Sequence, residues 1–271
     1  MFSLENNPEN DPGSRRVDGA AATAPKLEAL TRNALAGQWS ADGAIDWDQA
    51  PQLPDWLPER VYASVVSQLY HGERATLTMC RRLSEELAGT PAETFLRTQI
   101  ADEARHADIY ADYLGRLGIV VPPDEAMAAA YDGGLSWRGS YHAPVVAFHI
   151  VLEGEALDLL QACSRRFPCP LFRQINRRVS HDEARHIAFG KLFLRDRVRA
   201  LPLEERLEIY RWVRSLWRDC AAATRARYGL FGRFALRTGR AALEARWQRQ
   251  AEALAEIGLI GPEEAEVFAR I

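Results

Sequence analysis

The chain has 271 residues, of which 47% are hydrophobic and 26% charged, enough for one sizeable core or at most two small ones. A formal net charge of −3 gives no case for a nucleic-acid partner. No apolar run approaches the length of a bilayer span, and residues 1–36 hold no signal-peptide-like run. The four cysteines form no CxxC pair, so we expect a cytoplasmic protein without integral membrane contact.

The predicted elements begin with a disordered N-terminal arm over 1–36, which is rich in Pro, Asn, Gly, Ala and charge. The next segment carries Trp39, Trp47 and Trp56 among three prolines, which indicates an irregular lead-in packed on a larger body. Helical periodicity then predicts four core helices, at about 58–88, 91–117, 143–165 and 170–200. Residues 118–142 form a long crossover between the second and third of these helices.

The C-terminal part, residues 201–271, is predicted to be a helical extension packed on the bundle. Two helical patterns occupy about 203–228 and 231–257, and both are rich in arginine. One interpretation is that the long basic side chains reach water from the faces of packed helices. The alternative is a docking surface for an acidic partner or an anionic substrate.

One pentapeptide, Asp-Glu-Ala-Arg-His, occurs at 102–106 and again at 182–186. In each copy the Glu and the His are three residues apart, so on a helix both side chains share one face and can reach a single metal ion. One Glu-x-x-His is a weak signal, but two identical copies in separate helical stretches are hard to obtain by accident. The candidate ligands in the two copies are Glu103, His106, Glu183 and His186.

The offset of 80 residues between the copies extends to the preceding helices. Glu73 stands 30 residues before Glu103, and Glu153 stands 30 residues before Glu183. Each helix pair would offer a lone Glu and a Glu-x-x-His, the inward-facing ligand set of di-metal carboxylate bundles. Glu155 competes for the third-helix position, but it lies about 200° further round the helix, and only Glu153 keeps the offset.

Charge balance supports two divalent ions at this ligand set. The four glutamates bring four negative charges, which would be very unfavourable in a bundle core without cations. Oxygen and imidazole ligands suit iron or manganese better than metals that prefer thiolates. Six ligands shared by two ions leave open positions for dioxygen as co-substrate. We therefore expect two Fe ions, with Mn/Fe as the alternative.

A second set of side chains is expected to hold the ligands. Asp102 and Asp182 each directly precede a ligand Glu, and each would accept a hydrogen bond from the ligand histidine of the opposite pair. Arg105 and Arg185 would then neutralise these aspartates, with surface ion pairs as the competing interpretation. His149, one turn before Glu153, is expected beside the ligands or in the core, with a role as an extra ligand as the alternative.

From about Glu59 to Ala200 the chain resembles the ferritin-like superfamily of di-iron proteins. The aspartate before each ligand Glu and the arginine before each ligand His resemble the hydroxylase subunits of bacterial multicomponent monooxygenases, and residues 186–190 continue that likeness. The pattern is also similar to the small subunit of class I ribonucleotide reductase and to the ligand-binding oxidases related to it. The resemblance implies an all-α, ferritin-like four-helix bundle over 37–200 with its long crossover between helices two and three.

Three positions bear on the comparison with individual members of that superfamily. Tyr110 lies one turn after His106, where ribonucleotide reductase small subunits carry a radical tyrosine, and simple core packing is the alternative. Phe148 stands near the place where the related oxidases carry a cross-linking tyrosine. Val179 stands where aminobenzoate-type N-oxygenases carry a further histidine, and this departure counts against that activity.

The expected function is that of a non-haem di-iron, dioxygen-activating oxidoreductase, an oxidase or monooxygenase acting on a small organic substrate. Leu77, Phe95, Leu152 and Ala156 are candidates for an apolar pocket beside the metals, on helical spacing alone. Turnover would need an electron donor such as a ferredoxin or a reductase, and a homodimer is one candidate assembly. The alternatives are a ferroxidase or iron-handling protein, a radical-generating subunit using Tyr110, and a purely structural bundle.

Overall fold

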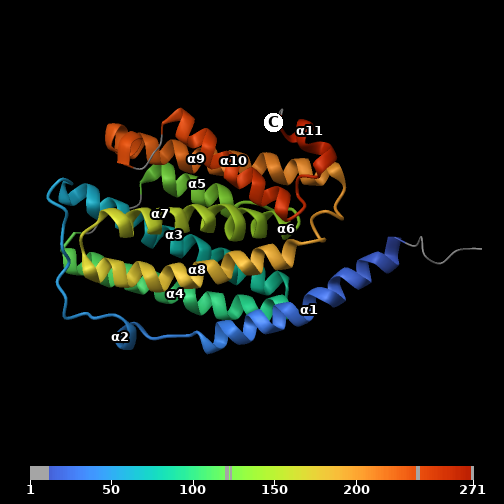
Figure 1. Cartoon of the computed structure of the whole chain (residues 1–271), viewed down its shortest axis with the longest axis horizontal. Helices are drawn as coiled ribbons and strands as arrows, with labels where there is room; N and C mark the ends of the chain where they lie inside the picture. The colour runs from blue at the N-terminus through green and yellow to red at the C-terminus, as the bar shows by residue number, and fades with distance from the viewer. Residues whose placement is uncertain (1–11, 120–121, 123, 236–238, 270–271) are drawn as a thin grey trace, which may run out of the picture.

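The chain folds as a helical bundle, shown in Figure 1. The computed structural model describes residues 12–119, 122, 124–235 and 239–269, and every regular element within these ranges is a helix. The bundle consists of α3 (Glu59–Glu86), α4 (Pro91–Leu117), a third helix made of α6 (His142–Val145), η2 (Val146–Leu152) and α7 (Glu153–Arg166), and α8 (Pro170–Leu194). The all-α bundle predicted from the sequence is therefore confirmed.

Local chemistry explains where two of these helices begin and end. Pro91 opens α4 at a position where its missing N–H leaves no hydrogen bond unmade. Gly118 ends α4 in the left-handed conformation, with φ of 68°, which glycine adopts without steric cost. The sulfur of Cys169 caps α8 by accepting a hydrogen bond from the Phe172 N–H. The predicted fourth helix ran to 200, whereas α8 ends at Leu194 and is followed by turns.

The third bundle helix is not a uniform α-helix. Between α6 and α7, the seven residues of η2 adopt a π-helical conformation, and α7 begins at Glu153. π-Helical turns are wider than α-helical turns and occur frequently at functional sites. The segment packs on α8 at Gly190, where a Cβ atom would lie only 2.7 Å from the Cβ of His149. The extent of the helix predicted at about 143–165 agrees with the structure. The hydrophobic periodicity of the sequence, however, does not indicate that part of it is π-helical.

The N-terminal arm is not disordered over its described part, so this prediction is wrong. Residues Pro12–Ala36 form α1, whose C-terminal part lies against α4 and α8 along one edge of the bundle, while its N-terminal part projects beyond the bundle in Figure 1. Leu27, Thr31 and Ala34 are buried and recur at helical spacing. The alanines that suggested a structureless composition are strong helix formers once one face has a surface to pack on. Residues 1–11 lie outside the described ranges.

The lead-in from α1 to α3 is irregular, as predicted, apart from the short helix α2 (Ala41–Ala44). The crossover from α4 to α6 contains an unpredicted helix, α5 (Glu125–Leu135), which Asp124 caps through the N–H groups of Ala126 and Met127. No periodicity stands out in that alanine- and glycine-rich stretch, so the sequence predicts a long connection there without indicating the helix.

The C-terminal extension covers one side of the bundle, above α7 in Figure 1. α9 (Leu203–Ala235) packs on α5 and η2, and its backbone breaks at Gly229, where φ is 48°. α10 (Arg240–Glu256) also packs on η2, and η3 (Pro262–Glu264) and α11 (Ala265–Ala269) follow it. The break agrees with the predicted end of a helix at about 228, but α10 begins at 240 rather than 231.

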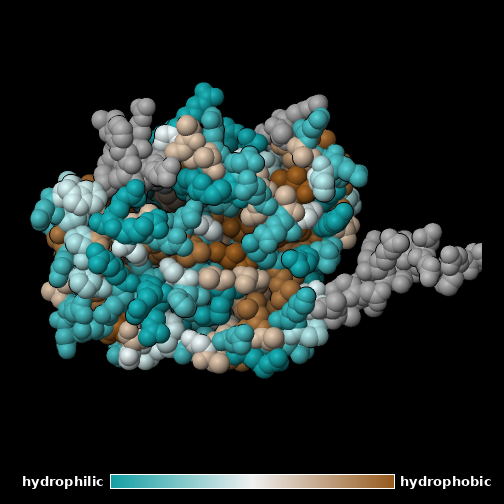
Figure 2. Space-filling model, in the orientation of Figure 1, coloured by the Kyte–Doolittle hydropathy of each residue, from teal (hydrophilic) through white to brown (hydrophobic). Residues whose placement is uncertain are grey.

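The apolar core consists of two clusters, one on either side of a polar layer. One cluster includes Phe95 and Phe189, and the other includes Ile109 and Val179. The repeated pentapeptide lies between them on both α4 and α8. Figure 2 shows hydrophilic residues over most of the face seen in Figure 1, with hydrophobic ones showing through in its middle. Within the described ranges, no helix combines the length and the apolar character that crossing a membrane requires.

Candidate metal centre

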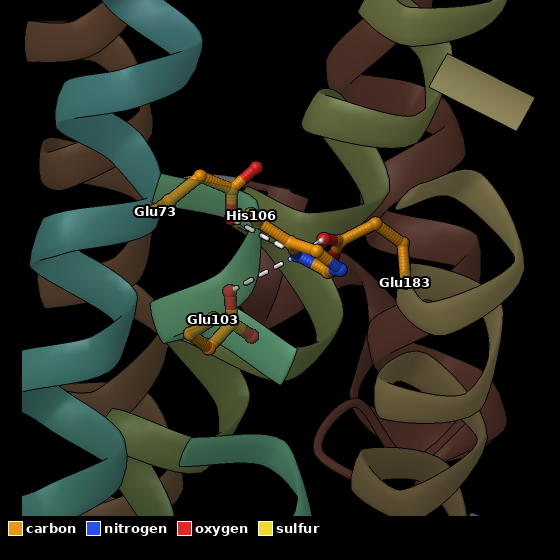
Figure 3. Close-up of side chains that lie close together, drawn as sticks. All are labelled: Glu73, Glu103, His106 and Glu183. Atoms are coloured by element: carbon orange, nitrogen blue, oxygen red, sulfur yellow. Dashed lines mark ion pairs between the residues drawn. The ribbon is translucent and has the colours of Figure 1, made fainter. Parts of the chain in front are cut away.

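The buried polar layer brings all six predicted ligands together as two overlapping groups. Ligand atoms of the first group, and likewise of the second, lie within 4.8 Å of one another. The first group is Glu73, Glu103, His106 and Glu183, drawn in Figure 3, and the second is Glu103, Glu153, Glu183 and His186. Because Glu103 and Glu183 belong to both groups, two ions held here would share two carboxylates.

Both histidines turn the same nitrogen toward the carboxylates. His106 Nδ1 lies 3.3 Å from Glu183 Oε1 and 3.6 Å from Glu73 Oε2. His186 Nδ1 lies 3.1 Å from Glu103 Oε1 and 3.8 Å from Glu153 Oε1. In each group the histidine and the carboxylates are close enough to bind one cation together. Figure 3 shows the side chains of the first group pointing toward one another.

The other ring nitrogen of each histidine meets an aspartate from the opposite helix. His106 Nε2 lies 3.0 Å from Asp182 Oδ2, and His186 Nε2 lies 3.2 Å from Asp102 Oδ2. An ionised aspartate can only accept, so each Nε2–H donates and each Nδ1 keeps a lone pair directed at the carboxylates. This is the crossed pairing that the sequence suggested for the two aspartates.

Two arginines join the aspartates into one network. Arg105 contacts Asp102 and lies 3.1 Å from Asp182 Oδ2, while Arg185 lies 2.5 Å from Asp182 Oδ1 and 3.2 Å from Asp102 Oδ2. The aspartates are 1% exposed and the arginine side chains only 13% and 19%, so these are not surface ion pairs. The pKa of Asp102 falls below its ordinary value although burial opposes this, because the hydrogen bond that it accepts from His186 favours its ionised form.

The lead-in completes that network with two side chains that sequence reasoning did not place. Gln38 Nε2 donates to Asp102 Oδ1 at 2.8 Å, and Trp39 Nε1 donates to Asp182 Oδ2 at 2.9 Å. The Arg105 guanidinium also stacks over the Trp39 ring, 4.6 Å from its centre. The sequence signalled that the Trp-rich segment packs on a larger body, but it held no register that would identify the contact.

The donor set fits a pair of divalent cations. Five atoms in the cluster are buried without a hydrogen-bond partner: Glu103 Oε2, His106 Nδ1, Glu153 Oε2, Glu183 Oε1 and His186 Nδ1. Burial is the main cause that raises the pKa of Glu73 and of Glu153 well above the ordinary value. Bare lone pairs and crowded carboxylates are unfavourable in an apolar core, and two divalent ions would satisfy both.

Three other residues that the sequence singled out, Glu155, Tyr110 and His149, lie outside the two groups of candidate ligands. Glu155 lies outside both groups, because it accepts a hydrogen bond from Gln250 at 2.8 Å and pairs with Arg246 on α10. Tyr110 is fully buried, and its hydroxyl lies 3.4 Å from Asn176 Oδ1. His149 is also fully buried, but its Nε2 meets Gln99 rather than a cluster carboxylate, so the geometry agrees with a supporting position.

A cavity of about 460 Å³ extends from the cluster toward the C-terminal helices. Glu73, Glu153 and Glu183 line its inner end. Its walls come from α3, α5, η2, α7, α9 and α10, with Leu69, Tyr131, Phe148, Leu152, Ala156 and Trp217 among them. Two of the four predicted pocket residues, Leu152 and Ala156, therefore line it. Phe95 does not, because its ring stacks on Phe189 at 4.4 Å, and Leu77 is not among the lining residues either.

Comparison with known proteins identifies one matching family, and the solved structures that match have the same helical-bundle fold. The family model for the P-aminobenzoate N-oxygenase AurF matches residues 76–224, which include every candidate ligand except Glu73. A single-residue variant of an R2-like ligand-binding oxidase, with an anaerobically reconstituted Mn/Fe cofactor, matches with a TM-score of 0.67 at 18% identity, covering 84% of this chain and 92% of the oxidase. No curated protein matches the chain.

A third protein, from Bacillus halodurans and provisionally named a class I ribonucleotide reductase, matches with a TM-score of 0.64 at 12% identity, over 86% of this chain and 92% of its own. These similarities show the ferritin-like bundle fold that the sequence predicted. Val179, which the sequence analysis weighed against N-oxygenation, is fully buried in an apolar cluster and offers no ligand atom. The family match nevertheless spans more than half of the chain, so the protein belongs to the P-aminobenzoate N-oxygenase AurF family.

Proposed function

We propose that the protein is a dioxygen-dependent oxidoreductase with two metal ions, Fe/Fe or Mn/Fe, that oxidises a small organic substrate bound in the 460 Å³ cavity. The single observation that carries this proposal is the buried cluster at the inner end of that cavity, where two carboxylate–histidine groups share Glu103 and Glu183. The metal pair would supply the site at which dioxygen binds and the electrons that activate it.

The roles of the surrounding side chains follow from their contacts. Glu73 and His106 would complete one metal position, and Glu153 and His186 the other. Asp182 and Asp102 would keep each histidine in the tautomer that leaves Nδ1 free for a metal. Two apolar clusters flank the layer on either side and lower the polarity around it, which strengthens the charge interactions inside it. An external electron donor, such as a ferredoxin or a reductase, belongs to this proposal.

The cavity supports an organic substrate rather than iron as the molecule acted on. A ferroxidase needs only the ligand set, whereas this chain lines a largely apolar cavity beside the ligands with residues of α5, α9 and α10. Beyond the cluster, the charged lining residues are four arginines and two acidic residues: Arg165, Arg166, Arg246, Arg249, Glu155 and Asp158. This excess of positive charge favours a substrate with an acidic group.

The family name makes p-aminobenzoate the first compound to test, because it joins an aromatic amine to a carboxylate. The apolar inner wall suits the ring, and the arginines suit the carboxylate. Oxidation of the amine remains a proposal for this chain, and Val179 marks the position at which it departs from the N-oxygenase pattern.

Oxygen uptake by the metal-loaded protein tests the proposal. We expect uptake to rise when an amphipathic aromatic acid is added together with a reductant. Leu152→Trp would fill part of the cavity and abolish that stimulation while metal content stays at two ions per chain. Leu203→Trp, at an exposed position on α9, is the matched control. If no aromatic or aliphatic acid stimulates uptake, or if Leu152→Trp leaves the stimulation intact, the cavity is not the substrate site.

A further inference from the structure

Gln99 is a buried side chain that joins one half of the cluster and has no counterpart in the other. It lies on α4, one turn before Glu103, and is fully buried. Its Nε2 lies 2.7 Å from Glu153 Oε1 and 3.0 Å from Glu103 Oε1. Its Oε1 lies 3.0 Å from His149 Nε2. One amide therefore spans two ligand carboxylates and a histidine.

The orientation of this amide follows from charge. An amide oxygen facing two carboxylate oxygens would be repelled by both, so the NH₂ group must face Glu153 and Glu103. The oxygen then faces His149, whose Nε2 must carry a hydrogen and donate it. Burial lowers the pKa of His149 to about 3, so the ring is neutral with one N–H to give. His149 thus fixes Gln99, and Gln99 fixes the carboxylates.

The π-helical segment η2 holds His149 in the position from which it contacts Gln99. His149 lies in the middle of η2, against Gly190 of α8 and 5.2 Å from the ring of Phe189. Since a Cβ at position 190 would approach His149 Cβ to 2.7 Å, glycine is what allows the segment to sit at this depth. The histidine therefore has little room to leave its hydrogen bond.

The internal repeat shows that the arrangement belongs to one half only. Adding the 80-residue offset to Gln99 gives Val179, and subtracting it from His149 gives Leu69. Both counterparts are buried in an apolar cluster. The oxygens that Gln99 contacts, Oε1 of Glu103 and Oε1 of Glu153, lie 3.1 and 3.8 Å from His186 Nδ1, whereas Glu103 turns its other oxygen, Oε2, toward His106 Nδ1 at 3.7 Å. The amide therefore bonds to the shared Glu103 through the oxygen that faces His186, and to Glu153, which belongs to the His186 group alone.

We propose that Gln99 and His149 are positioning residues that make the two metal positions unequal, by holding the Glu103 and Glu153 carboxylates ready for the ion beside His186. Two buried carboxylates repel one another, and the shared NH₂ donor keeps their oxygens together at the place where a cation would bind. Among the residues that the structure describes, no amide donates a hydrogen bond to Glu73 in this way. This inference rests on the proposed two-metal function and specifies how the two positions differ.

Anaerobic titration of the metal-free full chain with Mn²⁺, followed by equilibrium dialysis and metal analysis, tests the inference without any turnover. We expect two binding steps in the unaltered protein. Gln99→Met should weaken one step by about 10–100-fold, the usual effect of removing a partner of a ligand, and leave the other step unchanged. Thr98→Val, which removes a buried hydroxyl bonded to Phe95 O on the same helix, should leave both steps unchanged.

A matched pair at His149 separates positioning from packing. Glutamine can present an N–H near the position of the imidazole Nε2, and asparagine is too short to do so. We therefore expect His149→Gln to keep the affinity of both steps and His149→Asn to reproduce the loss seen in Gln99→Met. The double variant His149→Asn with Gln99→Met should lose no more than either single change, because both remove one connected arrangement.

Equal weakening of both steps, no weakening of either, or fully additive losses would each overturn the inference. Binding of fewer than two Mn²⁺ by the unaltered chain would instead overturn the two-metal function on which it rests. Circular dichroism melting of the metal-free variants shows whether each variant is folded. If Gln99→Met does not fold, the comparison of His149→Gln with His149→Asn still tests the inference.

Discussion

At the scale of single residues, each candidate ligand histidine presents one nitrogen to the carboxylates and the other to an aspartate from the facing helix. His106 depends on Asp182, and His186 depends on Asp102. The same two aspartates collect donors from Arg105, Arg185, Gln38 and Trp39, so their charge is balanced before any metal arrives. The ligands are therefore held from outside the cluster as well as within it.

Asp182→Asn is expected to weaken metal binding at the His106 position by about 10–100-fold. The amide would lose the charge that orients the His106 ring and would leave Arg105 with one fewer carboxylate partner. Asp108→Asn, on the exposed face of α4, is the control. Equilibrium dialysis against Mn²⁺ measures the metal affinity of both variants. Affinity in Asp182→Asn equal to that of the control would mean that the aspartate does not support the histidine.

Tyr110→Phe distinguishes an oxidase from a radical-generating subunit. The Tyr110 hydroxyl makes only a long contact of 3.4 Å to Asn176, so its removal should cost no more than about 1 kcal/mol of folding free energy. We expect oxygen uptake to be retained and no tyrosyl radical to appear in the EPR spectrum of either protein after oxygen exposure. A radical signal that disappears together with activity in the variant would support the radical function instead.

At the scale of elements, the third bundle helix changes type where it meets the metal layer. η2 is packed against Gly190, and α7 begins at Glu153 itself. The wide turns of η2 place His149 against α8 while Glu153 enters the cluster and Glu155 turns to α10. The helix type thus determines which of two nearby glutamates reaches the metal layer.

Gly190→Ala should destabilise the fold by about 1–3 kcal/mol, the usual cost of forcing an extra group into a packed core. The new Cβ would meet His149 Cβ at 2.7 Å and Ile150 Cδ1 at 3.1 Å, so η2 would have to shift. Gly115→Ala is the matched control on α4, where nothing lies within 4 Å and the change should stabilise the helix slightly. Urea unfolding of the two variants measures the difference. Equal stability would show that η2 is not held at Gly190.

The sequence contained enough to predict the bundle and all six residues of the cluster, because Glu-x-x-His spacing and the 80-residue offset are tied to helix geometry. The sequence does not predict contacts that depend on the tertiary structure and leave no regular spacing between residues. Gln99 lies one turn before Glu103, but a lone glutamine on a helix is unremarkable by pattern. Trp39 reaches Asp182 from an irregular segment, and its partner depends on the tertiary path of the chain. The composition around α1 is typical of a disordered segment, and the helix depends on the packing of Leu27 and Ala34 against the bundle, which composition does not reveal.

At the scale of the whole molecule, the C-terminal extension adds walls to a cavity beside the metal layer of the bundle. α9 and α10 supply Trp217, Thr224, Arg246 and Arg249 to the cavity, and α5 supplies Tyr131. Arg246 and Arg249 are paired with Glu155 and Asp158 of α7, so α10 is tied to the bundle by charge across the cavity wall. Arg246, one of the arginines that the composition suggested as a docking surface, is thus paired at the cavity wall, whereas the Arg249–Asp158 pair is exposed.

Arg246→Met is expected to raise the KM for an acidic substrate by at least about tenfold, a loss near 1.4 kcal/mol and within the range for hydrogen bonds to charged groups. The metal layer is not contacted by this side chain, so kcat should change less than KM. Arg240→Met, on an exposed arginine of the same helix, is the control. Steady-state oxygen uptake against substrate concentration gives both constants. An unchanged KM would exclude Arg246 from substrate binding.

The central claim is tested most directly by metal analysis of the full chain loaded anaerobically with ferrous iron, followed by stopped-flow absorption after mixing with oxygen. The account predicts two metal ions per chain and a transient visible absorption band, with both lost in Glu103→Ala, because that carboxylate belongs to both groups. One metal ion or none, with no transient band in the unaltered protein, would contradict it.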